Sequence, residues 1–211
     1  MKPIRTFICI FAHLLLFTGC ITSNYYSGQT LEKDKQALTL GVDNLLWIVD
    51  GEGVVHKGLT FSPGIGFAQG LPLRLEIGGR LYLPTAFEGF LRHQITPRSF
   101  QWFDMSANFH TGTIFHENFS EAAPPYTKFG FTVSRKIKSV QPFMGYYINN
   151  QYHDGDASEN YRIFTFGIAL PNKTDWIYPE FNYFKSRKSS KGFISFGVGV
   201  RTSFPKRKKA K

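Results

Sequence analysis

The stretch GFISFGVGVRTSF, residues 192–204, alternates bulky apolar residues with small or polar ones. Isoleucine, phenylalanine and valine occupy positions 194, 196, 198 and 200, whereas serine, glycine and arginine occupy 195, 197, 199 and 201. A period of two residues puts these two sets on opposite faces of an extended chain. The stretch therefore predicts a β-strand with one apolar face and one small, polar face.

Nine other segments of the chain show the same period of two. Between residues 36 and 204 almost no stretch has apolar residues at the 3.6-residue spacing of an amphipathic helix. The sequence therefore predicts an all-β domain, with strands at about 36–48, 58–68, 72–83, 86–95, 101–113, 126–134, 139–150, 160–170, 175–185 and 192–204.

The composition of the two faces separates membrane barrels from soluble β-proteins. The bulky face is rich in Phe, of which the whole chain has 22, while the other face carries Gly, Ser, Thr and Ala as often as charge. A soluble sandwich or lipocalin would bury its apolar face and cover the other with Lys and Glu. A narrow membrane barrel instead needs a small, polar lumen and an apolar outer face. We therefore predict a single antiparallel up-and-down β-barrel of membrane type, with about ten strands (8–10).

This pattern resembles that of small bacterial outer-membrane barrels over residues 36–204. In that family the last strand commonly ends in an aromatic residue that the barrel-assembly machinery reads. The last predicted strand of this chain matches that signal at Phe196, Val198, Val200 and Phe204. It departs from the family in that seven more residues, 205–211, follow Phe204. The resemblance implies an outer-membrane location and two partners, the membrane lipid and the assembly machinery.

An apolar run, FICIFAHLLLFTGC at residues 7–20, precedes the barrel. Lys2 and Arg5 give it a positive start, which is the layout of a secretory signal. The run is shorter than the roughly 20 apolar residues of a transmembrane helix.

The end of this run resembles the lipobox of bacterial lipoproteins, at Phe17, Thr18, Gly19 and Cys20. In that family the cysteine becomes the first mature residue and carries the lipid, so the resemblance implies a palmitate-bearing anchor at Cys20. The alternative is an ordinary signal that is cleaved elsewhere. The predicted organisation is a signal peptide over 1–19, a flexible tether over 20–35, the barrel over 36–204 and a basic disordered tail over 205–211.

A lipid on Cys20 would start the barrel on the periplasmic side of the membrane. Bacterial barrels have short periplasmic turns and longer external loops. The connections expected on the periplasmic side are short, whereas those at 49–57, 114–125, 151–159 and 186–191 are longer. The short connection at Pro84 and Thr85 departs from this rule. A second departure concerns strand pairing, because Pro63, Pro142 and Pro179 each lack the backbone N–H that a strand donates.

The charge balance makes nucleic acid a poor partner. The formal net charge of +10 falls to +3 without Lys2, Arg5 and the terminal PKRKKAK, and nucleic-acid binding needs a basic face on the folded domain. The basic tail could contact anionic lipid phosphates or be a solvated tail. Of the two cysteines, Cys9 lies inside the signal and Cys20 at its end, so the predicted mature chain has neither a disulfide nor a thiolate metal cluster.

Charged residues on the small, polar face would point into the lumen. Because unpaired charges in a narrow lumen are costly, we expect them to pair in a network that fills it, and a selective ion or solute path is the alternative. These residues are Arg74, Glu76, Arg80, Glu88, Arg92, Asp104, Lys128, Glu180 and Arg201.

No catalytic, cofactor or metal site stands out in the sequence. Some small barrels that resemble this one are enzymes on envelope lipids and use a histidine near the rim. The candidates here are His110, His116 with Glu117, and His153 with Asp154, but no serine stands at a spacing that marks a nucleophile. Asp154, Asp156 and Glu159 could hold Ca²⁺, although acidic external loops are ordinary.

The sequence therefore predicts a lipid-anchored outer-membrane β-barrel with a structural or surface-interaction role through its external loops. Two alternatives stay open. One is a barrel enzyme acting on envelope lipids, and the other is a soluble periplasmic lipoprotein barrel that binds an apolar ligand inside.

Overall fold

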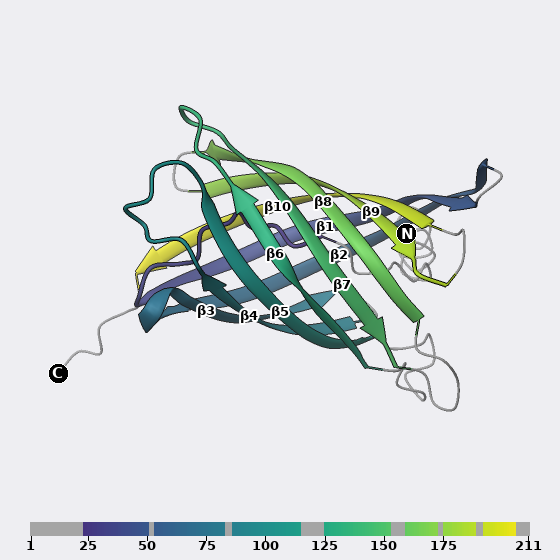
Figure 1. Ribbon diagram of the computed structural model, residues 1–211, viewed down its shortest axis with the longest axis horizontal. Helices are drawn as coiled ribbons and strands as arrows, with labels where there is room; N and C mark the ends of the chain where they lie inside the picture. Colours follow the sequence, from purple (N-terminus) through teal and green to yellow (C-terminus); the bar gives the residue numbers. More distant parts are fainter. Residues whose placement is uncertain are drawn as a thin grey trace, which may run out of the picture.

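Ten antiparallel strands follow one another around a closed ring in the computed structural model (Figure 1). The structure describes residues 23–50, 53–82, 86–114, 125–152, 159–172, 175–188 and 192–205. The strands are β1 (Lys35–Asp50), β2 (Gly53–Leu71), β3 (Leu75–Tyr82), β4 (Ala86–Gln94), β5 (Asp104–Ile114), β6 (Tyr126–Ser134), β7 (Gln141–Gln151), β8 (Glu159–Asn172), β9 (Asp175–Ser186) and β10 (Gly192–Pro205), with one 3₁₀ turn, η1 (Pro72–Arg74). Among the described residues, no helix is long and apolar enough to span a membrane.

The ring closes where the first strand meets the last. β1 pairs with β10 from Lys35 opposite Pro205 to Val49 opposite Gly192, and every other strand pairs with its neighbours in the chain. Closure thus gives every strand two neighbours, although β2 pairs with β3 only from Gly64 to Leu71. The predicted antiparallel up-and-down barrel of about ten strands is therefore confirmed.

The barrel has two rims, which we name by the chain ends that they carry. The proximal rim is the end at which β1 begins and β10 ends, and it carries the β2–β3, β4–β5, β6–β7 and β8–β9 turns. The distal rim is the opposite end.

The side chains divide between the outside and the inside of the barrel as the alternation predicts. Leu40, Phe129 and Phe166 point outward and are 53%, 50% and 49% exposed, whereas Glu88 and Arg92 point inward and are 0% exposed. A closed barrel encloses only its inner face. Its apolar outer face must therefore contact something other than this chain. This inside-out arrangement identifies the barrel as a membrane-type one.

Strand pairing changes two of the expected connections. β1 and β2 pair as far as Asp50 opposite Gly53, so the loop expected at 49–57 shrinks to 51–52. On the proximal rim, the connection between Gln94 and Asp104 spans 95–103. The expected contrast between short and long connections is therefore wrong at these two places.

Arg74 lies outside the lumen, contrary to the sequence prediction. It belongs to η1 at the proximal rim, where Leu73 and Arg74 have φ values of 58° and 60°. This left-handed turn breaks the period of two, so β3 begins only at Leu75. The Arg74 guanidinium donates to the Ile95 carbonyl at 3.4 Å on the neighbouring turn instead.

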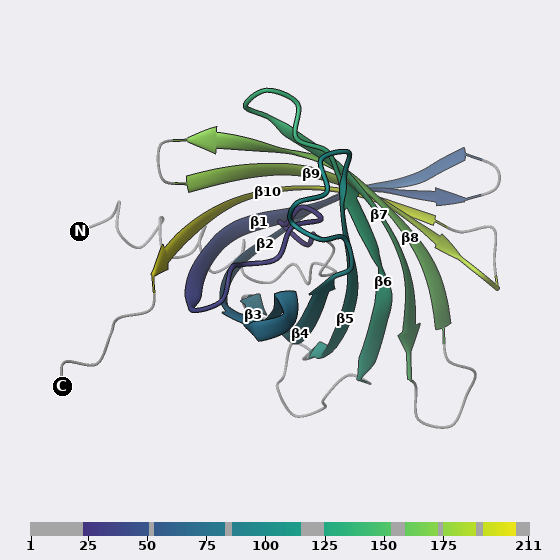
Figure 2. The same ribbon diagram turned by 60° about the vertical axis from the view of Figure 1, so that its left-hand side comes forward.

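The prediction of a flexible tether over 20–35 is wrong for the part that the structure describes. Ser23, Asn24, Tyr26 and Ser27 are between 0% and 4% exposed. Figure 2 shows this start of the described chain, in purple, within the ring of strands. The segment is buried because the barrel surrounds it, although nothing in its own sequence is strongly apolar.

An arginine on the outer face should destabilise the barrel in a bilayer. Phe129→Arg should lower the free energy of unfolding in lipid vesicles by about 2–4 kcal/mol, since the guanidinium would have to leave water for hydrocarbon. A denaturant titration followed by tryptophan fluorescence measures this change. Phe129→Leu is the matched control and should cost less than half as much, and equal effects of the two substitutions would contradict the membrane-facing assignment.

Candidate functional site

The N-terminal residues 23–31, which we call the plug segment, run from the middle of the lumen to the proximal rim. The backbone N–H of Ser23 donates to the Asp43 carboxylate at 3.0 Å. Asp43 lies eight residues into β1 from Lys35, or about 26 Å along the strand. The plug segment therefore fills the proximal part of the lumen rather than resting at its mouth.

Two turns at the proximal rim fix the lower end of the plug segment. The Asp34 N–H donates to the Gly70 carbonyl at 3.2 Å, and the Lys35 N–H donates to the Glu32 carbonyl at 3.1 Å. The Glu32 carboxylate lies 2.8 Å from the Lys35 ammonium and 3.4 Å from the Arg98 guanidinium. The hydrogen bond and charge of Lys35 lower the pKa of Glu32. The exposed ion pair between Glu32 and Lys35 therefore weakens only as the pH falls through this lowered pKa.

Carboxylates of the barrel wall accept hydrogen bonds from the backbone of the plug segment. Glu180 accepts from the N–H groups of Asn24, at 2.7 Å, and Tyr25, at 2.9 Å. Glu76 accepts from the N–H of Leu31 at 2.8 Å. These contacts take the place of ladder partners, because buried backbone N–H groups must be paired.

Cations of the barrel wall donate hydrogen bonds to oxygen atoms of the plug segment. Arg80 donates to the Ser23 carbonyl at 2.9 Å, and Arg92 donates to the carbonyls of Ser27 and Gln29. The Lys128 ammonium donates to the side-chain oxygen of Asn24 at 2.9 Å. The plug segment is therefore held through both its donors and its acceptors.

The same cations pair with two glutamates of the wall. Glu76 lies 3.2 Å from Arg92 and 2.7 Å from Arg201. Glu88 lies 3.6 Å from Arg80 and 3.3 Å from Lys128. Each buried carboxylate thus faces two cations, which offsets the several kcal/mol that desolvating each ion costs.

Tyr26 is the side chain around which the network gathers. Its hydroxyl lies 2.5 Å from Nε2 of His110, and Nδ1 of His110 lies 2.9 Å from the Glu88 carboxylate. Because a carboxylate only accepts, Nδ1 carries the proton and Nε2 accepts from Tyr26 in the neutral ring. The Arg92 guanidinium stacks 3.7 Å from the centroid of the Tyr26 ring, a cation–π contact.

Tyr25 occupies a channel that glycines leave open. A Cβ on Gly41 would lie 2.3 Å from the Tyr25 ring, and one on Gly199 would lie 2.4 Å from it. No other residue fits at either position while the ring stays in place. The Tyr25 hydroxyl donates to the Asp43 carboxylate, so the ring is fixed at its tip as well as along its faces.

The sequence analysis identified most of the residues that hold the plug segment. Eight of the nine predicted lumen charges are buried inside the barrel, with Arg74 as the exception. Other participants were missed: His110 was considered only as a rim candidate, and no role was predicted for Asp43, Tyr82, Gln94 and Ser134. Tyr25 and Tyr26 were missed as well, and two adjacent tyrosines in an otherwise polar linker are the signal that could have revealed them.

The catalytic and metal candidates gain no support from the described residues. Both ring nitrogens of His110 are engaged, with Glu88 and Tyr26. His116, Glu117, His153, Asp154 and Asp156 lie outside the described residues, as do Cys20 and the tail from 206 onward, and the side chain of Glu159 is not described. Within the described ranges, no group of three or more His, Cys, Asp or Glu side chains is placed to hold a metal ion.

Removing one acceptor from the wall should loosen the plug segment. In Glu180→Gln the side chain keeps one oxygen for the two N–H groups of Asn24 and Tyr25, and an unsatisfied buried donor costs about 1–3 kcal/mol. Amide hydrogen exchange at residues 24 and 25 should therefore quicken by about tenfold or more. Glu32→Gln, at the exposed rim, is the control and should leave exchange at these two amides unchanged, and unaltered exchange in Glu180→Gln would show that Glu180 does not hold the segment.

Comparison with known proteins found likenesses of structure alone. No protein-family model matches the chain, and no curated protein matches it. Among solved structures, the chain is similar to Ail, the attachment invasion locus protein of Yersinia pestis, with 9% identity and a TM-score of 0.39 over 82% of this chain and 99% of Ail. It is also similar to Neisserial surface protein A, with 11% identity and a TM-score of 0.37 over 80% of this chain and 97% of that one. The β domain of the Bordetella autotransporter BrkA aligns at 10% identity with a TM-score of 0.44, over 82% of this chain and 100% of that domain.

Proposed function

We propose that the protein is a bacterial outer-membrane β-barrel whose own N-terminal segment keeps the lumen closed, and that it has a structural or surface-interaction role rather than acting as an open channel. The observation that carries this proposal is the buried plug segment inside a barrel with an apolar exterior. The distal connections would then be the parts that meet other molecules.

The outer face supports a membrane location. Soluble monomers rarely expose contiguous apolar patches of more than a few hundred Å², yet outward Leu, Ile and Phe side chains between 37% and 53% exposed occur on strands all around this ring. Strands of 8 to 19 residues include lengths sufficient to cross a bilayer. Closed barrels are the only β-structures that satisfy every backbone group in lipid.

The lumen supports a closed rather than a conducting state. Arg80, Arg92 and Lys128 donate directly to the plug segment, so these cations line no continuous aqueous path in this conformation. The structural network expected from the sequence is therefore favoured over a permanent ion path.

The interior argues against a carrier of apolar ligands. The side chains that fill the lumen include Glu76, Glu88, Arg92 and His110, each 0% exposed. An apolar ligand would have to displace these ion pairs, at the desolvation cost of each ion. For the enzyme alternative, the engaged ring of His110 offers no support.

The last strand supports recognition by the barrel-assembly machinery. Its aromatic and branched side chains lie on the outer face, each between 37% and 40% exposed: Phe196, Val198, Val200 and Phe204. β10 also forms the seam with β1 that closes the ring. The side chains of this signal are thus accessible from outside the barrel. The backbone edge of β10 is accessible as well until β1 pairs with it.

A lipid on Cys20 would constrain the plug segment. Three residues of extended chain span at most about 11 Å, whereas Ser23 lies beside Asp43, eight residues into β1. With the plug segment seated, a lipid on Cys20 therefore could not reach the leaflet at the proximal rim. For Cys20 to be the anchor, either its lipid must enter the membrane on the distal side, or the plug segment must leave the lumen.

Lipidation itself has a direct test. Expressed with labelled palmitate, the wild-type protein should incorporate the label, and Cys20→Ser should lose it while keeping the folded barrel. Cys9→Ser is the control and should label like the wild type. Label that persists in Cys20→Ser would overturn the assignment of the anchor.

The closed lumen can be tested by electrical recording. The purified protein in planar bilayers should show no steady conductance, whereas Tyr25→Ala combined with Tyr26→Ala should open a path, because the two rings fill the lumen. Tyr146→Ala, a lipid-facing control, should stay closed. Heat-modifiable migration in gels must first show that each variant is folded.

Two results would contradict the proposed function. Steady conductance of the wild type would show that the plug segment does not close the lumen. Release of the folded protein from membranes by carbonate would show that the barrel does not span them.

A further inference from the structure

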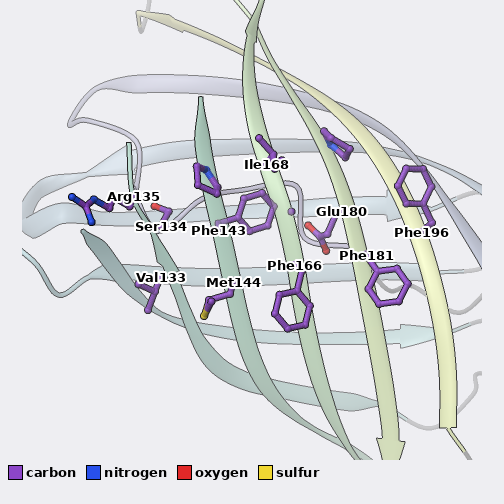
Figure 3. A pocket seen from close by; sticks show the side chains of 13 residues that line it. Val133, Ser134, Arg135, Phe143, Met144, Phe166, Ile168, Glu180, Phe181 and Phe196 are labelled. Atoms are coloured by element: carbon purple, nitrogen blue, oxygen red, sulfur yellow. The ribbon is translucent and has the colours of Figure 1, made fainter. Parts of the chain in front are cut away.

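A groove opens on the outer wall of the barrel across β6 to β10 (Figure 3). Its volume is about 580 Å³, within the range of small-molecule sites. Outward side chains of Met144, Phe166, Phe181 and Phe196 border it, and Arg135 lies at its proximal end. The groove thus faces the lipid at its side and reaches the rim at one end.

Two prolines explain why the wall is irregular here. Pro142 of β7 stands opposite Ile168 of β8, and the register of β9 puts Pro179 opposite the same residue from the other side. Proline has no N–H, so Pro142 and Pro179 each lack a backbone donor in the ladders on either side of β8. The β8–β9 ladder accordingly stops at Gly167 and resumes at Leu170.

The floor of the groove is closed toward the lumen. The Phe143 ring, 5% exposed, lies under Gly167, where an added Cβ would meet it at 2.3 Å. Glu180 also borders the groove, but its carboxylate points inward and accepts from the backbone of Asn24 and Tyr25. The groove therefore offers hydrocarbon contacts and no open passage.

A basic turn stands at the proximal end of the groove. The β6–β7 turn contains Arg135, Lys136 and Lys138, all exposed. The turn is well defined, because the Arg135 N–H donates to the Pro142 carbonyl at 3.1 Å and Ile137 pairs with Val140. The basic turn therefore stands next to the apolar surface of the groove, which Arg135 borders.

We propose that this groove binds one anionic glycerophospholipid, with an acyl chain against Met144, Phe166 and Phe181 and the phosphate on the turn that begins at Arg135. Basic pockets beside an apolar membrane-facing surface recognise anionic headgroups. The proposal commits to the leaflet at the proximal rim, because the cations lie at that end. It rests on the membrane location proposed above.

Native mass spectrometry of the detergent-purified full chain tests the proposal. The probes are phosphatidylglycerol and phosphatidylcholine with identical acyl chains, and lipid A as a third lipid. The wild type should retain phosphatidylglycerol in preference to phosphatidylcholine. Arg135→Gln should lower that retention by about fivefold, the effect of about one cation at a membrane surface, and Arg135→Lys should keep most of it.

A second variant tests the acyl contact separately from the charge. Met144→Trp fills the groove and should reduce retention of both lipids. Leu91→Trp makes a similar change at a lipid-facing position on β4, 42% exposed, away from the groove, and should bind like the wild type. Heat-modifiable migration confirms the fold of each variant, and carbonate extraction tests the membrane location independently.

Three outcomes would overturn the proposal. Equal retention of the two lipids by the wild type would indicate ordinary annular lipid. Unchanged retention in both Arg135→Gln and Met144→Trp would show that the lipid binds elsewhere. Preferential retention of lipid A over phosphatidylglycerol would assign the groove to a different lipid.

Discussion

The structure depends on one constraint, which is that a chain inside a barrel has no strand to pair with. Residues 23–31 carry buried backbone donors and acceptors, and every buried one must find a partner. Wall carboxylates at Glu76 and Glu180 take the donors, while Arg80 and Arg92 take the acceptors. The lumen charges are therefore arranged for the plug segment as much as for one another.

This constraint accounts for the composition of the inner face. Glycines at 41 and 199 make room for the Tyr25 ring, and Tyr26 meets His110 through its hydroxyl and the Arg92 guanidinium through its ring face. The inner face therefore combines small residues, which leave room for a ring of the plug segment, with charged residues, which form ion pairs. Without the plug segment, the Glu180 carboxylate would lose the two N–H groups from which it accepts.

The wall and the plug segment meet at Glu180. Its carboxylate holds two N–H groups inside, and its strand borders the irregular region that Pro142 and Pro179 create outside. A local weakening of the ladder at this place is therefore adjacent to a principal contact of the plug segment.

The sequence by itself determined the fold class and, along the regular strands, the face to which most side chains point. The reason is local, since an extended backbone turns successive side chains to opposite faces whatever the rest of the chain does. Eight of the nine lumen charges followed from that period alone, and Arg74 failed because the left-handed turn at 73 and 74 interrupts it.

Only the tertiary structure decided what occupies the lumen. The plug segment has no period, and its polar residues are typical of a solvated linker. Its contacts join residues as far apart as Asn24 and Glu180, separated by 156 positions. Such contacts depend on the closure of the ring, which brings ten strands around one segment, and no local pattern encodes them.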